Sequence, residues 1–214
     1  MLDGPLPRAT NATTALLVPV KAFAHAKQRL APALDPSSRE ALARAMAATV
    51  LDAAGGLRVA VVCDDEAVRA WAGTQGAEAI WTPGLGLNGA VEAGIAHLAR
   101  RGVQRVVVAH ADLPLARDLT WLTDGDGVTL VPDRHGDGTN VACVPATSGF
   151  LFAYGAGSFA AHRAEAARLE LVVRLVPDVA LGCDVDVPVD LHVPASLHPP
   201  TYLSATSLAE APCP

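Results

Sequence analysis

The feature that most constrains this chain is the apolar run Val106–Ala109, which stops at His110-Ala111-Asp112. A continuous apolar run without polar alternation is typical of a strand covered on both faces, as in a parallel sheet. Such sheets bind ligands at the carboxyl ends of their strands, which is where Asp112 lies. The sequence therefore predicts a buried strand with a candidate functional carboxylate at its end. The alternative is that Asp112 only caps a short helix that follows.

Other apolar runs alternate with helix patterns along the whole chain. Strands are expected at residues 15–20, 57–63, 77–81, 104–110, 128–132 and 139–144, and residues 170–176 and 182–187 complete the regular part. Helices are expected at 35–54, after Asp64-Asp65, at 87–101, at 114–122 and at 158–169. This alternation predicts an α/β fold of the Rossmann-like, three-layer α/β/α type with a mainly parallel sheet. An antiparallel element is considered at residues 133–144.

The length of 214 residues fits one domain, which we place at residues 12–193, with flexible termini at 1–11 and 194–214. A net charge of -6 argues against binding to nucleic acid or to an anionic membrane. Neither a membrane span nor the apolar core of a signal peptide is found. The four cysteines form no C-x-x-C pair, so free thiols in a reducing cytoplasm are expected.

Two further acidic residues, Asp184 and Asp186, are two positions apart. In an extended chain such side chains point to the same side, and they repel each other unless a cation lies between them. A hard divalent ion such as Mg²⁺ is the usual partner, and Asp112 would be a third ligand. An exposed acidic turn is the alternative.

Three cations, Lys21, Lys27 and Arg29, follow the first expected strand directly. Positive side chains at that edge of a sheet suit a polyphosphate ligand. The interleaved Ala, Phe and Leu residues favour a partly packed loop over a solvated charge run.

Residues 84–89 match G-x-G-x-x-G between a strand and a helix, the dinucleotide-binding pattern. The match follows the third strand rather than the first, so a plain turn that begins a helix remains an alternative. The sequence has no G-x-x-x-x-G-K-[ST] phosphate loop and no G-x-S-x-G nucleophile. Residues 133–140 and 154–159 could bind an anion or be ordinary turns. His110, His135 and His162 lack metal-type spacing, and we interpret them as loop or core residues.

Seven motifs in one order give a more specific indication. They are Pro19-Val20-Lys21 with residues 26–30, Asp64-Asp65, residues 86–90, Ala111–Pro114, residues 133–140, residues 154–162 and residues 183–191. Together they resemble the 2-phospholactate (also phosphoenolpyruvate) guanylyltransferase family of deazaflavin coenzyme F-420 biosynthesis. The resemblance covers residues 15–191 and implies the nucleotide-diphosphosugar transferase fold.

The resemblance also implies an activity: guanylyl transfer from GTP to the phosphate of a three-carbon phospho-acid, with pyrophosphate released. By similarity, Asp112, Asp184 and Asp186 hold Mg²⁺. Lys21, Lys27 and Arg29 face the phosphates with Asp112 at the catalytic centre, and Lys21, Gly86, Leu87 and Asn88 bind the nucleotide. The acid is bound by Thr139, Asn140, Gly155 and Ser158.

Alternatives stay open at this point. Residues 84–89 could serve a nicotinamide-dependent oxidoreductase, and a non-catalytic nucleotide-binding module is a third option. A molybdenum-cofactor or sugar nucleotidyltransferase would be a variant of the same class. The acceptor acid and the oligomeric state are not defined, with a homodimer among the options.

Overall fold

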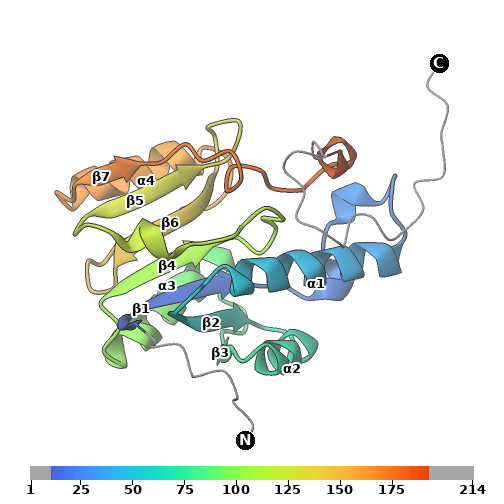
Figure 1. Ribbon diagram of the computed structural model, residues 1–214, viewed down its shortest axis with the longest axis horizontal. Coiled ribbons are helices and arrows are strands. Elements are labelled where there is room, and N and C mark those ends of the chain that lie inside the picture. Colours follow the sequence, from blue (N-terminus) through green and yellow to red (C-terminus); the bar gives the residue numbers. More distant parts are fainter. Residues whose placement is uncertain (1–10, 193–214) are drawn as a thin grey trace, which may run out of the picture.

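The computed structural model describes residues 11–192 and is built on a seven-stranded sheet of order β3-β2-β1-β4-β6-β5-β7 (Figure 1). The strands are β1 (Asn11–Pro19), β2 (Leu57–Cys63), β3 (Glu78–Trp81), β4 (Arg105–Ala109), β5 (Val128–Pro132), β6 (Thr139–Pro145) and β7 (Val173–Leu175). The helices are α1 (Pro36–Asp52), α2 (Glu66–Thr74), α3 (Gly86–Arg100) and α4 (Ser158–Arg168). Short 3-10 helices are η1 (Phe23–His25), η2 (Gln28–Leu30), η3 (Thr120–Thr123) and η4 (Pro188–Leu191).

The sheet is mainly parallel, as the alternating pattern predicted. Strands β1, β2, β3 and β4 run in one direction, whereas β6 is antiparallel to both β4 and β5. The antiparallel element considered at 133–144 is therefore confirmed. Ala109 pairs with Val141, so the beginning of β6 lies beside the end of β4. This reversal brings residues 139–140 to the edge of the sheet where β4 ends.

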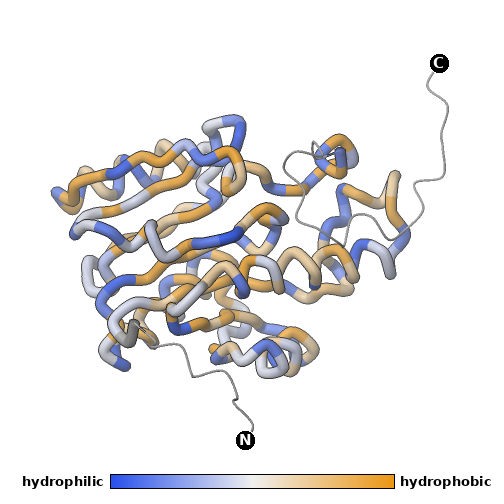
Figure 2. Tube along the Cα trace, viewed as in Figure 1, coloured by the Kyte–Doolittle hydropathy of each residue, from blue (hydrophilic) through white to orange (hydrophobic). Residues whose placement is uncertain are grey.

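Helices cover both faces of the sheet and give the expected three layers. Alternate residues of β1 point to opposite sides. Leu16 and Val18 pack with α1 and α2, while Ala15 and Leu17 pack with α3 and α4. The apolar strands at the centre of Figure 2 are accordingly among the most hydrophobic parts of the tube. Among residues 11–192, no helix has the length and apolar character needed to cross a bilayer.

Local signals fix the ends of the helices. The Asp35 side chain accepts the Ser38 N–H at 3.0 Å, with Pro36 at the first helical position, and the Asp65 side chain accepts the Val68 N–H at 3.0 Å. Both helices begin where the sequence placed them, since an N-terminal aspartate followed by a helix pattern is a local start signal. Three of the four cysteines lie in the described part, and all three are free thiols, as expected.

Two expected elements are absent. The prediction of a helix at 114–122 was wrong, because the only helical turn there is the 3-10 helix Thr120–Thr123. Leu113, Leu115 and Leu119 are all buried without a helical period, and the Leu119 N–H donates to Ala53 O at 2.9 Å. Residues 182–187 form no strand, although Gly182 and Val185 are buried. The termini expected to be flexible, 1–11 and 194–214, lie almost wholly outside the described residues.

Candidate functional site

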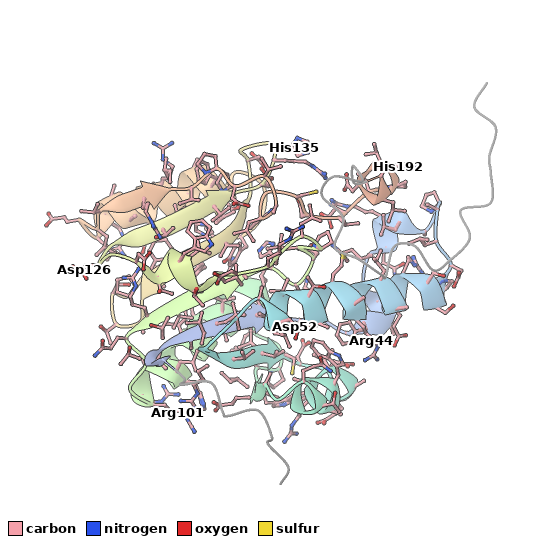
Figure 3. All side chains as sticks on the ribbon, in the orientation of Figure 1. Arg44, Asp52, Arg101, Asp126, His135 and His192 are labelled. Carbon is pink, nitrogen blue, oxygen red and sulfur yellow. The ribbon has the colours of Figure 1, made fainter. Side chains whose placement is uncertain are left out.

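A cavity of about 760 Å³ opens at the carboxyl ends of β1, β2 and β4. Residues just beyond these strands line it, together with the segment that contains η1 and η2. Figure 3 shows Asp126, which precedes β5, and His135, which follows it, at opposite ends of that strand. Because β5 runs parallel to β4, the cavity lies toward the His135 end. This is the edge where parallel sheets bind their ligands.

Lys27 is at the centre of the polar residues in the cavity wall. Its Nζ donates to Asp112 Oδ2 at 2.6 Å and to Asp186 Oδ1 at 2.8 Å. The Lys27 backbone is left-handed, with φ 53°, an uncommon conformation for a residue with a side chain. Burial lowers the pKa of Lys27, but the two carboxylates more than offset it and raise that pKa overall. The ammonium group is therefore charged and binds two acidic residues that are distant in sequence.

Asp184 belongs to the same cluster. Burial, and then the charge of Asp112, raise the pKa of Asp184. Asp184 Oδ1 and Asp112 Oδ1 are buried without a hydrogen-bond partner among residues 11–192. Burial also disfavours the charge of Asp186, yet Lys27 lowers its pKa overall. The three carboxylates expected to act together thus do gather, with an ammonium group between two of them.

The cluster is not a ready-made metal site. No group of three His, Cys, Asp or Glu side chains in residues 11–192 has the arrangement of one. Lys27 takes the position between Asp112 and Asp186 that a metal ion would need. Any metal must therefore compete with this ammonium group or displace it.

The segment that carries Asp184 and Asp186 is held by Asp190. Asp190 Oδ2 accepts the N–H groups of Asp186 and Val187, both at 2.8 Å, and Asp190 Oδ1 lies 2.6 Å from Arg134 Nη2. Arg134 Nη2 also donates to the Asp184 carbonyl at 3.2 Å. Sequence reasoning placed Arg134 and Asp190 in two separate motif segments but did not predict their ion pair, because no local pattern indicates that they meet.

The other two expected cations are more exposed. Lys21 is exposed on the cavity wall. Arg29 lies 3.8 Å from Asp186 Oδ2, and 77% of its side chain is accessible. Both side chains can therefore turn toward an anionic ligand in the cavity, whereas Lys27 is already bound to carboxylates.

Two residues expected to bind the acid, Thr139 and Ser158, form a buried hydroxyl pair. Ser158 Oγ accepts the Thr139 N–H at 3.0 Å. His162 Nε2 accepts the Ala153 N–H at 3.0 Å, so the hydrogen of the neutral ring is on Nδ1, which lies 2.9 Å from Thr139 Oγ1. Burial, with a smaller effect from His110, lowers the pKa of His162 to about 4, which keeps the ring neutral at pH 7. Each hydroxyl oxygen thus accepts one bond and keeps its own hydrogen to donate.

The hydroxyl pair lies outside the cavity wall, where β6 begins beside the end of β4. The His110 N–H donates to Asn140 O at 3.0 Å, which joins the end of β4 to the beginning of β6. Asn140, also expected to bind the acid, uses its amide nitrogen to donate to Leu181 O at 2.9 Å. Gly155, the fourth such residue, is exposed with φ 134°. The structure brings Thr139 and Ser158 together and leaves Asn140 in an internal bond.

Of the three residues expected to bind the nucleoside, two lie in the cavity wall and one does not. Gly86 and Leu87 line the cavity, whereas Asn88 does not. Asn88 Oδ1 accepts the Tyr154 N–H at 2.9 Å and so ties α3 to the loop before α4. The glycine-rich turn follows β3 at the edge of the sheet, not the central strand that a dinucleotide fold uses.

His110 and Tyr154 were not expected to be functional. Their rings are 4.9 Å apart, and both His110 Nε2 and the Tyr154 hydroxyl are buried without a hydrogen-bond partner among residues 11–192. His110 also lines the cavity. Its position directly after a buried strand, two residues before Asp112, was the available signal.

With this geometry established, comparison with known proteins decides the family. Residues 14–198 match the family described as "Guanylyl transferase CofC like". The chain belongs to this CofC guanylyltransferase family. The family resemblance read from the seven motifs is thereby confirmed, and the nicotinamide-dependent alternative is set aside.

Individual relatives agree with the CofC assignment. The phosphoenolpyruvate guanylyltransferase of Sphaerobacter thermophilus is 36% identical over 177 residues, covering 76% of this chain and 83% of that protein. That of Streptomyces coelicolor is 38% identical over 182 residues, covering 78% and 85%. The 2-phospho-L-lactate guanylyltransferase of Methanothermobacter thermautotrophicus is 34% identical over 163 residues, covering 72% and 71%.

Solved structures support the fold expected for a CofC protein. A putative nucleotide-diphospho-sugar transferase from Desulfovibrio desulfuricans G20 superposes with a TM-score of 0.64 at 18% identity, covering 82% of this chain and 83% of that one. A CMP:2-keto-3-deoxy-manno-octonic acid synthetase superposes with a TM-score of 0.54 at 15% identity, covering 84% and 95%. The expected nucleotide-diphosphosugar transferase fold is confirmed.

Proposed function

We propose that this chain transfers GMP from GTP to the phosphate of a three-carbon phospho-acid during coenzyme F-420 biosynthesis. The acceptor is phosphoenolpyruvate, 2-phospholactate or 3-phosphoglycerate. The observation that carries the proposal is the cluster of Lys27, Asp112 and Asp186 at the carboxyl edge of the sheet. Relatives named phosphoenolpyruvate and 2-phospho-L-lactate guanylyltransferase support the first two of these acceptors.

The reaction needs charge control more than proton transfer. An oxygen of the acceptor phosphate attacks the α-phosphorus of GTP, a new P–O–P bond forms, the α–β bond breaks, and pyrophosphate leaves. The acceptor phosphate is already ionised at neutral pH, so no general base is required. The difficulty is to bring two anions together in line, which positioned cations solve. The site has those groups and no activated nucleophile.

The acidic cluster fits Mg²⁺ by its donor set. Asp112, Asp184 and Asp186 offer hard oxygen ligands, and two of their oxygens are buried without a partner. Lys27 already occupies the position of a cation between two of these residues. Bound there, Mg²⁺ would neutralise phosphate charge and fix the geometry of attack.

Other residues of the site are assigned to binding the triphosphate, the nucleoside and the acid. Lys21 and Arg29 are exposed and can pair with the triphosphate, and Lys27 is placed to join them once it leaves the carboxylates. Gly86 and Leu87 form the cavity wall for the nucleoside. The hydroxyl hydrogens of Thr139 and Ser158 are donors for the carboxylate of the acid. Free thiols at the described cysteines fit a reducing cytoplasm.

The test is an acceptor panel. Protein, GTP and Mg²⁺ are mixed with each of the three phospho-acids, and pyrophosphate release and product mass are measured. We expect a GMP adduct with at least one acid, and far less product when ATP or CTP replaces GTP. Folded protein that releases no pyrophosphate with any of the three would refute the proposal.

A further inference from the structure

Six buried side-chain atoms in residues 11–192 have no hydrogen-bond partner, and four of them are in or beside the site. They are Asp112 Oδ1, Asp184 Oδ1, His110 Nε2 and the Tyr154 hydroxyl. Burying a polar atom without a partner is unfavourable, so such atoms in a native structure call for an explanation. A metal ion bound by Asp112 and Asp184 would account for the two carboxylate oxygens, which leaves His110 Nε2 and the Tyr154 hydroxyl to be explained.

His110 lies between the two groups that the proposed acceptor must contact. On one side, His110 shares the cavity wall with Asp112 and Asp186. On the other side, its ring packs against Tyr154, which in turn packs against His162 with ring centroids 4.9 Å apart. His162 Nδ1 in turn lies 2.9 Å from the hydroxyl oxygen of Thr139, one member of the hydroxyl pair.

The ring of His110 is held in place. The backbone N–H of His110 donates to Asn140 O, which fixes the backbone to β6, and the Tyr154 ring covers one side of the imidazole. The loop with Tyr154 is anchored in turn, because the Tyr154 N–H donates to Asn88 and the Phe152 N–H donates to Glu92 Oε1 at 3.1 Å. A fixed imidazole with a buried, unpaired nitrogen is suited to bind a polar ligand group.

His110 shares the cavity wall with Asp112 and is linked through Tyr154 and His162 to Thr139, so its ring lies on the side of the acidic cluster that faces the hydroxyl pair. We infer that His110 is an acceptor-binding residue, whose ring nitrogen hydrogen-bonds the phospho-acid between Asp112 and Thr139. The inference rests on the proposed function. It assigns to His110 a contact with the acid rather than with GTP.

His110→Phe tests this inference because it keeps an aromatic ring against Tyr154 and removes both nitrogens. We expect KM for the phospho-acid to rise about tenfold or more, the usual effect of losing a hydrogen bond to a charged group, while KM for GTP stays within about twofold. His110→Gln, which restores an amide N–H, should recover part of the loss. His97→Phe on α3, outside the cavity wall, is the control and should leave both KM values near wild type.

Binding is measured separately by titration calorimetry of phosphoenolpyruvate into protein with Mg²⁺ and a non-hydrolysable GTP analogue. Wild type that binds the acid about tenfold or more tightly than His110→Phe supports the inference. Equal affinity, equal KM values, or a His110→Gln variant no better than His110→Phe would overturn it while leaving the proposed function intact. Wild type that neither binds nor uses any of the acids overturns both.

Discussion

At the scale of single residues, Lys27 determines the charge balance of the acidic cluster. Its ammonium group neutralises two carboxylates that would otherwise repel each other, and it does so from a left-handed backbone conformation. The same contacts place it where a divalent ion is proposed to bind. The pattern of three cations after β1 was visible in the sequence. That Lys27 pairs with carboxylates 85 and 159 residues away was not visible, because it depends on the fold.

Removing the Lys27 ammonium group should strengthen metal binding, whereas removing a metal ligand would weaken it. Lys27→Met should raise the affinity of the substrate-free protein for Mn²⁺ by about fivefold or more, because a competing positive charge leaves the carboxylates. It should also lower turnover, since the phosphates lose a cation. Electron paramagnetic resonance of free Mn²⁺ measures the affinity.

Arg29→Met is the matched control for Lys27→Met. Arg29 is largely exposed and lies 3.8 Å from only one of the carboxylates, so its loss should change Mn²⁺ affinity less. A Lys27→Met protein that binds Mn²⁺ more weakly than wild type would contradict competition between Lys27 and the metal.

At the scale of elements, the position of α3 depends on Gly94. A Cβ built there would lie 2.6 Å from Val62 Cγ1 and 2.9 Å from Leu17 Cδ2, both in buried strands. The helix therefore packs closely on β1 and β2, and Gly86 and Leu87 at its start reach the cavity wall. The absence of a side chain at this position sets the distance between helix and sheet.

Two glycine-to-alanine changes separate packing from helix propensity. Gly94→Ala should lower the free energy of unfolding by about 1–3 kcal/mol, because overpacking outweighs the gain in helix propensity. Gly73→Ala in α2, where a Cβ meets nothing within 4 Å, should be neutral or stabilising by up to about 1 kcal/mol. Urea unfolding measures both. Equal effects of the two changes would contradict the close packing of α3.

Elements also show where sequence reasoning succeeds and where it fails. The Val-rich β4 and the helix capped by Asp35 were predicted because burial on both faces and a capping aspartate are local patterns. Residues 114–122 were assigned to a helix, but they are buried as an irregular segment held partly by a bond to Ala53, a contact that no local pattern encodes. The same limit applies to the site. Asp112 was found at a strand end and His110 carried the same signal, whereas the pairing of Asp190 with Arg134 emerges only from tertiary contacts.

At the scale of the whole molecule, His162 links stability to pH. It is fully buried, packs against Phe150, Phe152 and Tyr154, and has a pKa lowered to about 4 from 6.5. Between these values the unfolded chain binds a proton that the folded chain does not. The free energy of unfolding should therefore fall as pH drops from 6.5 to 4, with His162 contributing at most about 3 kcal/mol.

Urea unfolding across this pH range isolates the contribution of His162. His162→Phe should be less stable than wild type at pH 7, because the Ala153 N–H loses its acceptor, but it should lose less stability on acidification. His135→Phe, on an exposed loop, should keep the wild-type dependence. A His162→Phe protein with the full wild-type slope would show that other groups control the acid response.

The central claim is that Asp112, Asp184 and Asp186 bind one divalent ion together. Mn²⁺ titration of the GTP complex, followed by electron paramagnetic resonance, tests it most directly in wild type and in three single Asp→Asn variants. Each of Asp112→Asn, Asp184→Asn and Asp186→Asn should weaken Mn²⁺ binding about tenfold or more, whereas Asp126→Asn at the opposite end of β5 should not. If any one of the three site variants bound Mn²⁺ as tightly as wild type, a metal site shared by all three carboxylates would be contradicted.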